Sequence, residues 1–235
     1  MPIYYGSQKV KPNGIKQAYF GSQKVYSLSR LPSSYQEVEW IGSSGAQYIN
    51  TAIKLGSKTE IDIDYSVNSP SSADQNPFGC YTQQSGNYIV FAISVKSTGT
   101  TFWCGDVLNH FNYSANISVN ANQKYNVKLK YERTNQSAAY LDGVAYGTGA
   151  TNYQTSYYYA NSNTIRLFGL YAYNSMDNYL TGKIYRCSIK QGDVLVRDFV
   201  PCYRISDGVI GLYDLVNNTF YTNQGTGSFT KGNNI

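Results

Sequence analysis

The last fifth of the chain, residues 183–229, is a series of short apolar segments separated by residues that favour turns. The turn residues are Gln-Gly-Asp at 191–193, Ser-Asp-Gly at 206–208, Asn-Asn at 217–218 and Gly-Thr-Gly at 225–227. Apolar runs bounded by such clusters, about ten residues apart, are typical of an antiparallel sandwich or barrel. This stretch therefore predicts an all-β fold.

The composition agrees with β structure. The chain has 235 residues, of which 25 are tyrosine, and only 14% are charged. Gly, Ser, Asn, Thr and Tyr are common, which disfavours helices and suits strands joined by tight turns. No long stretch shows the apolar period of about 3.6 residues that a helix would need. The length allows one large all-β domain with a small appendage.

Two segments alternate between apolar and polar residues, as expected of strands with one buried face. The residues expected to face the core are Ile61, Ile63, Tyr65 and Val67 in the first segment and Tyr125, Val127, Leu129 and Tyr131 in the second. Residues 88–95 are almost continuously apolar, which predicts a central strand covered on both faces. Asp142-Gly143, between two apolar segments, predicts a hairpin turn with positive φ at both positions.

The first 30 residues contain a repeat: YYGSQKV at 4–10 recurs as YFGSQKV at 19–25. Each copy is expected to form a strand–turn–strand unit that is too small to bury a core alone. Two interpretations remain open, because the arm could pack on its own domain or dock by strand addition onto a larger assembly. The residues expected to make the assembly contact are Tyr4, Tyr5, Lys9, Tyr19, Phe20 and Lys24.

The sequence divides into this arm, residues 1–30, and a main domain, residues 31–235, with residues 31–34 as the linker. The main domain holds 14 basic and 14 acidic residues, so the net charge of +5 belongs to the arm. A neutral main domain gives little support for nucleic-acid binding. The sequence shows no signal peptide and no membrane-spanning apolar run, so we expect synthesis in a cytoplasm and no membrane insertion.

The four cysteines, at positions 80, 104, 187 and 202, have no CxxC spacing, and the only histidine is His110. A zinc site is therefore not expected. In a cytoplasmic product we expect four reduced and mostly buried thiols. A Cys187–Cys202 disulfide between neighbouring strands is the alternative.

Residues 31–53 read LPSSYQEVEWIGSSGAQYINTAI, residues 124–147 read KYNVKLKYERTNQSAAYLDGVAYG, and residues 165–173 read IRLFGLYAY. With the closing segments at 183–204 and 211–229, this set resembles the laminin-G-like, concanavalin A-like jelly-roll domains found in phages and gut Gram-positive bacteria. The resemblance covers about residues 31–232 and implies two stacked antiparallel sheets of about six or seven strands each. More loosely, the repeated arm resembles N-terminal pieces of phage virion proteins.

The nearest match to a catalytic motif is the acidic strand Glu60-Ile61-Asp62-Ile63-Asp64. Retaining jelly-roll glycoside hydrolases carry a Glu-x-Asp-x-(x)-Glu strand whose carboxylates act as nucleophile and acid. Here the last position is an aspartate, the motif lies on an early strand, and no tryptophan flanks it. We therefore expect a solvated acidic face, with hydrolysis by Glu60 and Asp64 as the weaker alternative. His110 has no partners for a hydrolase triad and is expected in a loop or on the surface.

Calcium is a feature that the resemblance implies, because laminin-G-like domains often bind it through loop aspartates and backbone carbonyls. The loop aspartates expected here are Asp74, Asp106 and Asp177, and none lies beside a second acid in the sequence. We expect no resident metal and no other cofactor, with calcium as the alternative.

Tyrosines cluster in two polar segments just before the C-terminal stretch. Sugars stack their apolar faces on Tyr or Trp, while Asn, Asp and Gln bind their hydroxyls. The candidate ligand-binding residues are Tyr153, Tyr157, Tyr158, Tyr159, Tyr173, Asp177, Asn178 and Tyr179. The alternative is that the tyrosines pack in the core, which we favour for Tyr171. It cannot hold for all of 157–159, because neighbouring strand residues point to opposite faces.

These features favour a non-enzymatic phage virion protein, a decoration or fibre component of the head or tail. In this interpretation the arm attaches the chain to another virion protein, and the jelly roll binds glycans on the host surface. A purely structural decoration protein, whose tyrosines contact other subunits, is the alternative, and a glycoside hydrolase is a more remote one. Because single sugar sites bind weakly, a homo-oligomer is expected to strengthen binding.

Overall fold

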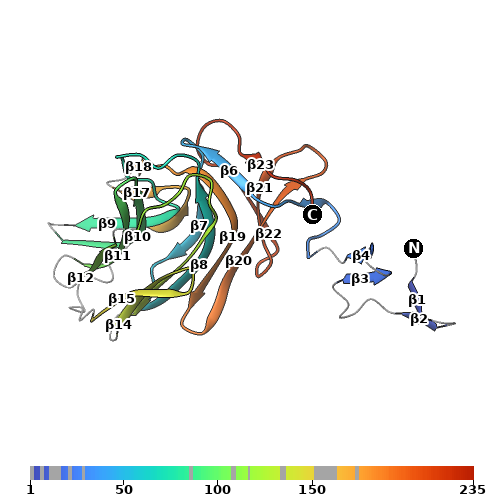
Figure 1. The fold of residues 1–235 in the computed structure, drawn as a ribbon, viewed down its shortest axis with the longest axis horizontal. Coiled ribbons are helices and arrows are strands. Elements are labelled where there is room, and N and C mark those ends of the chain that lie inside the picture. Colours follow the sequence, from blue (N-terminus) through green and yellow to red (C-terminus); the bar gives the residue numbers. More distant parts are fainter. Residues whose placement is uncertain are drawn as a thin grey trace.

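The computed structural model describes residues 3–5, 8–10, 17–20, 23–27, 30–84, 87–106, 110–115, 117–132, 136–150, 163–172 and 175–235. These residues form strands and turns, and no helix occurs among them. Within this part of the chain, no helical segment could therefore cross a membrane. Figure 1 shows two curved sheets that face each other, with two small hairpins to one side. The predicted all-β sandwich is confirmed.

The larger sheet has eleven strands. Its main path runs β15-β14-β13-β8-β19-β20-β21-β22, while β5 pairs with β20, β6 with β19, and β23 with β6. The strands are β5 (Tyr35–Glu37), β6 (Ile41–Ser44), β8 (Lys58–Val67), β13 (Tyr125–Glu132), β14 (Gln136–Leu141), β15 (Val144–Ala150), β19 (Thr181–Gln191), β20 (Val194–Arg204), β21 (Ile210–Asp214), β22 (Thr219–Thr222) and β23 (Thr230–Lys231).

The smaller sheet has eight strands, with the main path β12-β11-β10-β9-β16-β7. A short hairpin, β17–β18, joins this sheet through a single parallel pairing of β17 with β9. The strands are β7 (Ile49–Lys54), β9 (Phe78–Gln84), β10 (Asn87–Lys96), β11 (Gly99–Asp106), β12 (His110–Ala115), β16 (Thr164–Leu167), β17 (Leu170–Ala172) and β18 (Ser175–Asp177). The sheets are therefore unequal, not six or seven strands each as the resemblance implied.

The core lies between the two sheets. The two predicted alternating segments are the adjacent strands β8 and β13, and all eight of their expected inward residues are at most 4% exposed. In β10, every residue from Ile89 to Val95 is buried, so the predicted central strand covered on both faces is also confirmed. Burying one large apolar side chain stabilises a fold by about 1.5–3 kcal/mol, so these strands supply much of the stability.

The hairpin predicted at Asp142-Gly143 joins β14 to β15. Both residues have positive φ, 48° and 79° respectively. Asp142 also accepts a hydrogen bond from the backbone N–H of Asn126, at 2.7 Å, which ties the turn to the neighbouring strand β13.

A second, smaller cluster lies apart from the main core and joins residues 31–35 to β20 and β21. Leu31, Val200, Cys202 and Tyr213 are buried in it, and partly buried side chains of Tyr35, Leu215 and Phe220 pack against them. Within the predicted linker at 31–34, Leu31 is only 6% exposed. Tyr35 N–H donates to the carbonyl of Pro32, at 2.9 Å, and closes a turn there.

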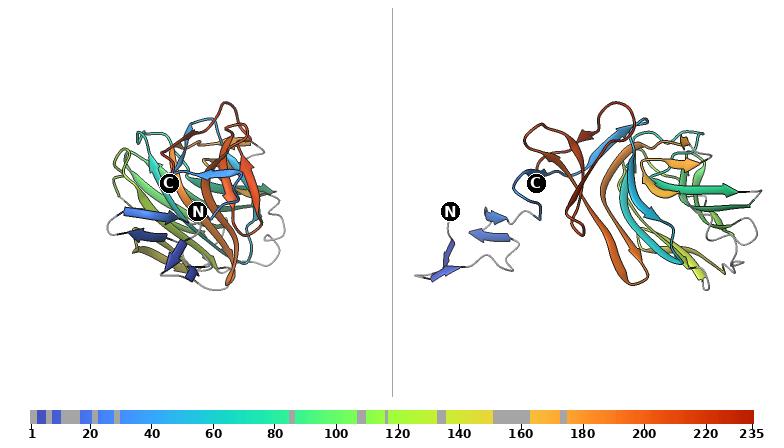
Figure 2. Two further views of the ribbon diagram at one scale, coloured as in Figure 1. Left: turned by 90° about the vertical axis from the view of Figure 1, so that its right-hand side faces the viewer. Right: turned by 180° about the vertical axis from the view of Figure 1, so that it is seen from behind.

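The repeated arm forms two hairpins, one for each copy of the repeat. The first pairs β1 (Ile3–Tyr5) with β2 (Gln8–Val10), and the second pairs β3 (Gln17–Phe20) with β4 (Gln23–Ser27). Tyr4 lies opposite Lys9, and Tyr19 lies opposite Lys24, so the two copies pair alike next to the turn, and only the second has a register shift beyond it, between Ala18 and Tyr19. Among the described strands, each hairpin pairs only with itself, and Figures 1 and 2 show both beyond the β20–β22 end of the sandwich.

The side chains of the predicted anchoring residues Tyr4, Tyr5, Lys9, Tyr19, Phe20 and Lys24 lie outside what the structure describes. The boundary at residue 30 and the anchoring role of the arm therefore stay predictions.

All four cysteines are free and buried, so the alternative of a Cys187–Cys202 disulfide is wrong. Cys187 on β19 lies opposite Phe199 on β20, three residues before Cys202. Residues an odd number apart on a strand point to opposite faces. Cys187 accordingly packs in the main core and Cys202 in the second cluster. Burial raises the pKa of both thiols, that of Cys202 to about 12.

Candidate functional site

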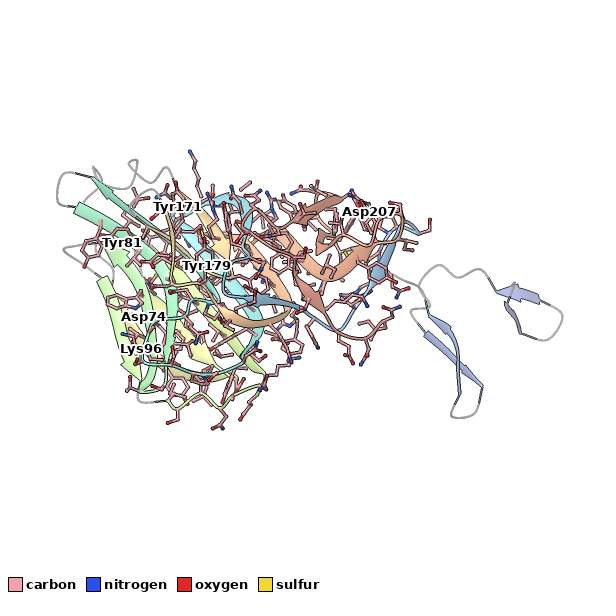
Figure 3. The ribbon with its side chains drawn as sticks, turned by 90° about the horizontal axis from the view of Figure 1, so that it is seen from above. Asp74, Tyr81, Lys96, Tyr171, Tyr179 and Asp207 are labelled. Atoms are coloured by element: carbon pink, nitrogen blue, oxygen red, sulfur yellow. The ribbon has the colours of Figure 1, made fainter. Side chains whose placement is uncertain are left out.

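A hollow of about 590 Å³ opens where three separate segments meet. The segments are the turn before β7, the β17–β18 hairpin with the residues that follow it, and the turn after β22. Three partly buried tyrosines, Tyr48, Tyr171 and Tyr179, line it. Figure 3 shows Tyr171 and Tyr179 close to each other in the view from above.

Backbone contacts join the first and third segments closely. Thr226 N–H donates to the carbonyl of Ala46 at 3.1 Å, and Gln224 N–H donates to the carbonyl of Tyr48 at 3.0 Å. Gly225 stands between these donors, and any Cβ there would overlap the carbonyl oxygen of Ala46. Glycine is therefore required for the two turns to approach this closely.

Polar side chains hold the same two turns from within. Gln47 is only 3% exposed; its amide oxygen accepts from Ser44 N–H at 2.8 Å, and its amide nitrogen donates to the carbonyl of Thr226 at 2.9 Å. Asn223 Oδ1 accepts from the N–H groups of Tyr48 and Gly225. Because these contacts are internal to the protein, this wall of the hollow is formed before any ligand binds.

The second segment places Tyr179 across from Tyr48, with ring centroids 6.5 Å apart. Asn178, which has a positive φ of 48°, turns the chain out of the hairpin, and its carbonyl accepts from Asn76 N–H at 2.9 Å. Burial and the neighbouring Tyr48 raise the pKa of the Tyr179 phenol. This hydroxyl is therefore neutral at physiological pH and can both donate and accept a hydrogen bond.

The structure places the predicted ligand residues unevenly. Tyr179 lines the hollow, while Asp177 and Asn178 belong to the same segment but not to the lining. Tyr171, expected in the core, lines the hollow instead. The remaining candidates, Tyr153, Tyr157, Tyr158, Tyr159 and Tyr173, lie outside the described residues.

The sequence reasoning missed Tyr48, Gln224 and Thr226 as lining residues. The available signal was alternation: Tyr48 directly precedes the buried Ile49, so it had to point away from the core.

The acidic strand is not the solvated face that was expected. β8 is a central strand between β13 and β19, and Asp64 is only 7% exposed. Asp64 pairs with Lys124 at 2.9 Å, Asp62 pairs with Arg186 at 2.7 Å, and Glu60 lies 3.8 Å from Lys190.

Burial alone would raise the pKa of Asp64, but hydrogen bonds from Lys124 and Asn126 and the charge of Arg186 hold it below its ordinary value. A general acid in a glycosidase needs a raised pKa. Asp64 is therefore a poor proton donor.

The other predicted sites are placed as follows. His110 is the first residue of β12 rather than a loop residue, and its side chain lies outside the described part. Asp106 ends β11 and is not in a loop either. Asp74 pairs with Lys96 at 3.0 Å and accepts a hydrogen bond from Ser94. Over the described residues, no three His, Cys, Asp or Glu side chains are grouped as a metal site would need.

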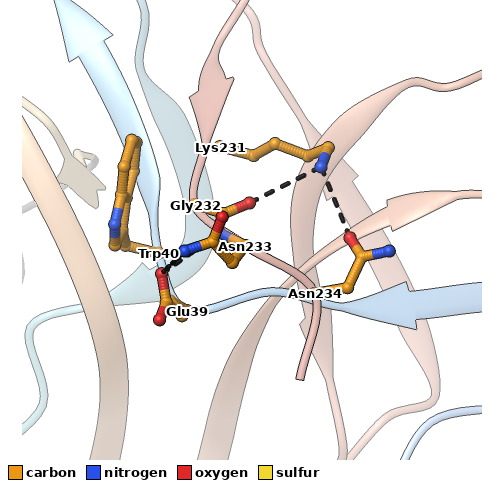
Figure 4. A pocket seen from close by; sticks show the side chains of 6 residues that line it. All are labelled: Glu39, Trp40, Lys231, Gly232, Asn233 and Asn234. Atoms are coloured by element: carbon orange, nitrogen blue, oxygen red, sulfur yellow. Dashed lines mark hydrogen bonds between the residues drawn. The ribbon is translucent and has the colours of Figure 1, made fainter.

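A second hollow, of about 640 Å³, lies between β6 and the C-terminal segment (Figure 4). Its polar groups already bind one another: the Glu39 carboxylate accepts two hydrogen bonds from Asn233, each of 3.1 Å. Lys183 Nζ lies 4.5 Å from the centre of the Trp40 ring. These contacts secure the C-terminal segment to the sandwich, which is a structural role.

No family model and no curated protein sequence matches this chain. Among solved structures, it is similar to the CBM40 of the Ruminococcus gnavus IT-sialidase bound to alpha2,3 sialyllactose. That match has a TM-score of 0.50 and 15% identity over 66% of this chain and 90% of the other. A SAP-like pentraxin from Limulus polyphemus matches with a TM-score of 0.49 and 14% identity, over 69% and 77% of the two chains.

Domains LG4-5 of the mouse laminin alpha1 chain match with a TM-score of 0.47 and 9% identity, over 80% and 52% of the two chains. At such identities, structural likeness bears on the fold alone. With the sheet order described above, the fold is an antiparallel jelly-roll sandwich, as the sequence resemblance implied.

Proposed function

We propose that this chain is a non-enzymatic glycan-binding protein and that the hollow between Tyr48, Tyr171 and Tyr179 is its sugar site. The observation that carries the proposal is the set of three partly exposed tyrosines around one preformed hollow. Aromatic rings offer apolar faces on which sugar rings stack, and their hydroxyls reach the sugar hydroxyls.

Two further observations support this proposal. The Ruminococcus gnavus CBM40, which has a similar fold, was solved with a sialylated sugar bound. In this chain, the carboxylate Asp64 of the acidic strand is compensated by cations and has a lowered pKa, which suits a structural role better than acid catalysis.

A glycan array tests the sugar site, with Tyr179→Ala as the variant and Tyr140→Ala as the matched control. Tyr140 lies on β14 in the larger sheet and does not line the hollow. Loss of one stacking ring should weaken binding by about tenfold or more. Tyr140→Ala should bind as the unchanged protein does. If no glycan binds, or if Tyr179→Ala binds equally well, the sugar site is wrong.

We also propose that the arm attaches the domain to a virion, as a decoration or fibre protein of the head or tail made in the host cytoplasm. Each hairpin has only two strands, so its outer edges have unpaired backbone groups that a partner strand can pair with. The chain should co-purify with intact particles at a fixed copy number, and a chain that begins at residue 30 should not. Absence from purified particles would contradict the attachment.

The same arm also suits a structural decoration protein that binds no glycan. Particles that lack the protein separate the two functions: reduced adsorption to host cells supports glycan binding. Normal adsorption with less stable particles supports decoration. Several copies on one particle, or a homo-oligomer, would supply the avidity that weak single sugar sites need.

A further inference from the structure

We infer that the glycan bound at the hollow carries an anionic group, a carboxylate or a sulfate, that pairs with Arg166. This inference rests on the sugar site proposed above. It specifies the chemical class of the ligand, and it comes from an arginine whose charge the protein leaves uncompensated.

Four of the five arginines with described side chains form ion pairs. Arg30 pairs with Glu37, Arg186 with Asp62 and Asp64, Arg197 with Asp214, and Arg204 with Asp207. Arg166 has no carboxylate within 4.0 Å among the described side chains, although it is partly buried.

The undescribed parts of the chain do not supply the missing acid. The segments at 1–2, 6–7, 11–16, 21–22, 28–29, 85–86, 107–109, 116, 133–135, 151–162 and 173–174 contain no Asp or Glu. The one acid whose side chain is not described is Asp106, which lies on β11. Three strand spacings separate β11 from β16 in the sheet order, roughly 14 Å. We therefore expect Arg166 to pair with an anionic group of a bound ligand.

The orientation of Arg166 is fixed in advance. Its Nη1 donates to Asn50 Oδ1 at 2.6 Å and to the carbonyl of Thr164 at 3.1 Å. Asn50 Oδ1 also accepts from Thr164 Oγ1 at 2.6 Å and from Ala52 N–H at 2.9 Å. The amide oxygen of Asn50 on β7 thus binds both Arg166 and Thr164 on the adjacent strand β16.

A backbone irregularity on β7 creates this arrangement. Thr164 lies opposite Lys54, but Arg166 lies opposite Asn50, so the register shifts between them. Ala52, inside the shift, has a φ of 60°, which a residue with a Cβ rarely adopts. Strained backbone and β-bulges often aim side chains at functional sites. Here they aim the oxygen of Asn50 at Arg166.

The guanidinium retains donors for a ligand. Arg166 Nε is buried without a hydrogen-bond partner, and Nη2 has none among the described residues. These two donors share the edge of the guanidinium that can bind a carboxylate or sulfate through two parallel hydrogen bonds, and a ligand reaches Nε only when the side chains that cover it move. Burial lowers the pKa of Arg166, which agrees with an uncompensated charge, although an arginine stays protonated.

Arg166 also adjoins the proposed sugar site. Its guanidinium lies 4.8 Å from the centre of the Tyr171 ring, and Tyr171 lines the hollow. Tyr48, another lining residue, acts to raise the pKa of Arg166, against the larger effect of burial. A sugar stacked on this wall can therefore direct an acidic substituent towards Arg166.

The test uses lactose, sialyllactose and sulfated lactose on one array with other matched neutral and acidic glycans. The unchanged protein should bind acidic glycans about tenfold more tightly than their neutral counterparts, because a charge-assisted pair is added. Added salt should weaken the binding of the acidic glycans and not that of the neutral glycans. Comparing the binding of sialyllactose with that of sulfated lactose shows whether a carboxylate or a sulfate is preferred.

Arg166→Gln should reduce the binding of acidic glycans to the level of the neutral ones, so that the preference of the unchanged protein for acidic glycans is lost. Arg166→Lys keeps the charge without the planar fork, so it should restore part of the difference. Lys128→Gln is the matched control, since it removes a cation from β13 in the larger sheet.

The outcomes separate this inference from the sugar site itself. If neutral and acidic glycans bind equally well to the unchanged protein, the anionic ligand is wrong and the sugar site survives. If Arg166→Gln folds and weakens both classes equally, the inference is also overturned. If no glycan binds at all, both proposals fail. The comparison of glycans and the salt dependence need only the unchanged protein, so they decide the question even if the Arg166 variants do not fold.

Discussion

Asp64 is buried and yet charged, because one cation just before β13 and another on β19 compensate it. Lys124 lies 2.9 Å away just before β13, and Arg186 lies 3.1 Å away on β19. Asn126 donates a further hydrogen bond of 2.8 Å. The outer face of β8 is therefore held to its neighbours by ionic contacts, while its inner face packs in the core.

Asp64→Asn should make the protein less sensitive to acid. The pKa of Asp64 is lower in the folded protein than in the unfolded chain. The charged Asp64 therefore stabilises the folded state fully at pH values above the unfolded pKa, and this stabilisation is lost as the pH falls through the folded pKa. Relative to the unchanged protein, the free energy of unfolding of the variant should be lower by about 1–3 kcal/mol at pH 7 and by less at pH 3. Urea unfolding at both pH values measures the difference, with the exposed turn residue Asp193→Asn as control. Equal acid sensitivity in Asp64→Asn and the unchanged protein would contradict this account.

The sequence predicted which residues of β8 face the core but not the state of Asp64. Alternation along one strand assigns Ile61 and Ile63 to one face and Asp62 and Asp64 to the other. It does not give the pairing register, which brings Arg186 from a strand more than a hundred residues away in the chain. Burial of a carboxylate depends on that register, so it could not be read from a single segment.

Gly225 controls the distance between the two turns that form one wall of the hollow. Gly225→Ala should destabilise the protein by about 1–3 kcal/mol, because the added methyl group forces the turn after β22 away from Ala46. The same displacement should weaken glycan binding, since Ala46 and Thr226 both line the hollow. Thermal unfolding and the glycan array measure the two effects.

Gly192→Ala is the control for this prediction. Gly192 has a φ of 61° and nothing within 4 Å of an added Cβ, so its substitution strains only a distant turn. It should lower stability without changing glycan binding. A Gly225→Ala variant with normal affinity would show that the hollow is not the sugar site or tolerates the shift.

The elements were more predictable than the site. The turns at 191–193 and 206–208 and the Asp142-Gly143 hairpin could be predicted because their residue types encode the local backbone. The hollow combines Tyr48, Tyr171 and Thr226, which are far apart in the sequence. Each has an ordinary local setting, and only the order of strands in the sheets brings them together.

The whole molecule consists of a sandwich and an arm, and the region that joins them belongs to the sandwich. Arg30 pairs with Glu37, and Leu31 is buried in the second cluster. The Tyr35 ring lies 4.9 Å from both Tyr213 and Phe220. Arg30 and Leu31 therefore contact the sandwich, while the boundary of the arm at residue 30 stays a prediction.

Two truncations test this boundary. A chain beginning at residue 30 should unfold as the full chain does, because the arm hairpins pair with no described strand of the sandwich. A chain beginning at residue 39 loses the buried side chains of Leu31 and Val38 and the partly buried side chain of Tyr35, which should lower stability by about 4 kcal/mol or more. Urea unfolding measures both.

Thiol labelling reports the same boundary at a single residue. In the full chain and in the chain beginning at residue 30, Cys202 is buried, its pKa is raised to about 12, and it should resist a maleimide. In the chain beginning at residue 39, β5 no longer pairs with β20, and Leu31 and Tyr35 are lost from the cluster around Cys202, so Cys202 should be labelled before Cys80, Cys104 and Cys187. If the chain beginning at residue 30 is itself labelled or unfolded, the arm is part of the core and the proposed attachment to a particle loses its structural basis.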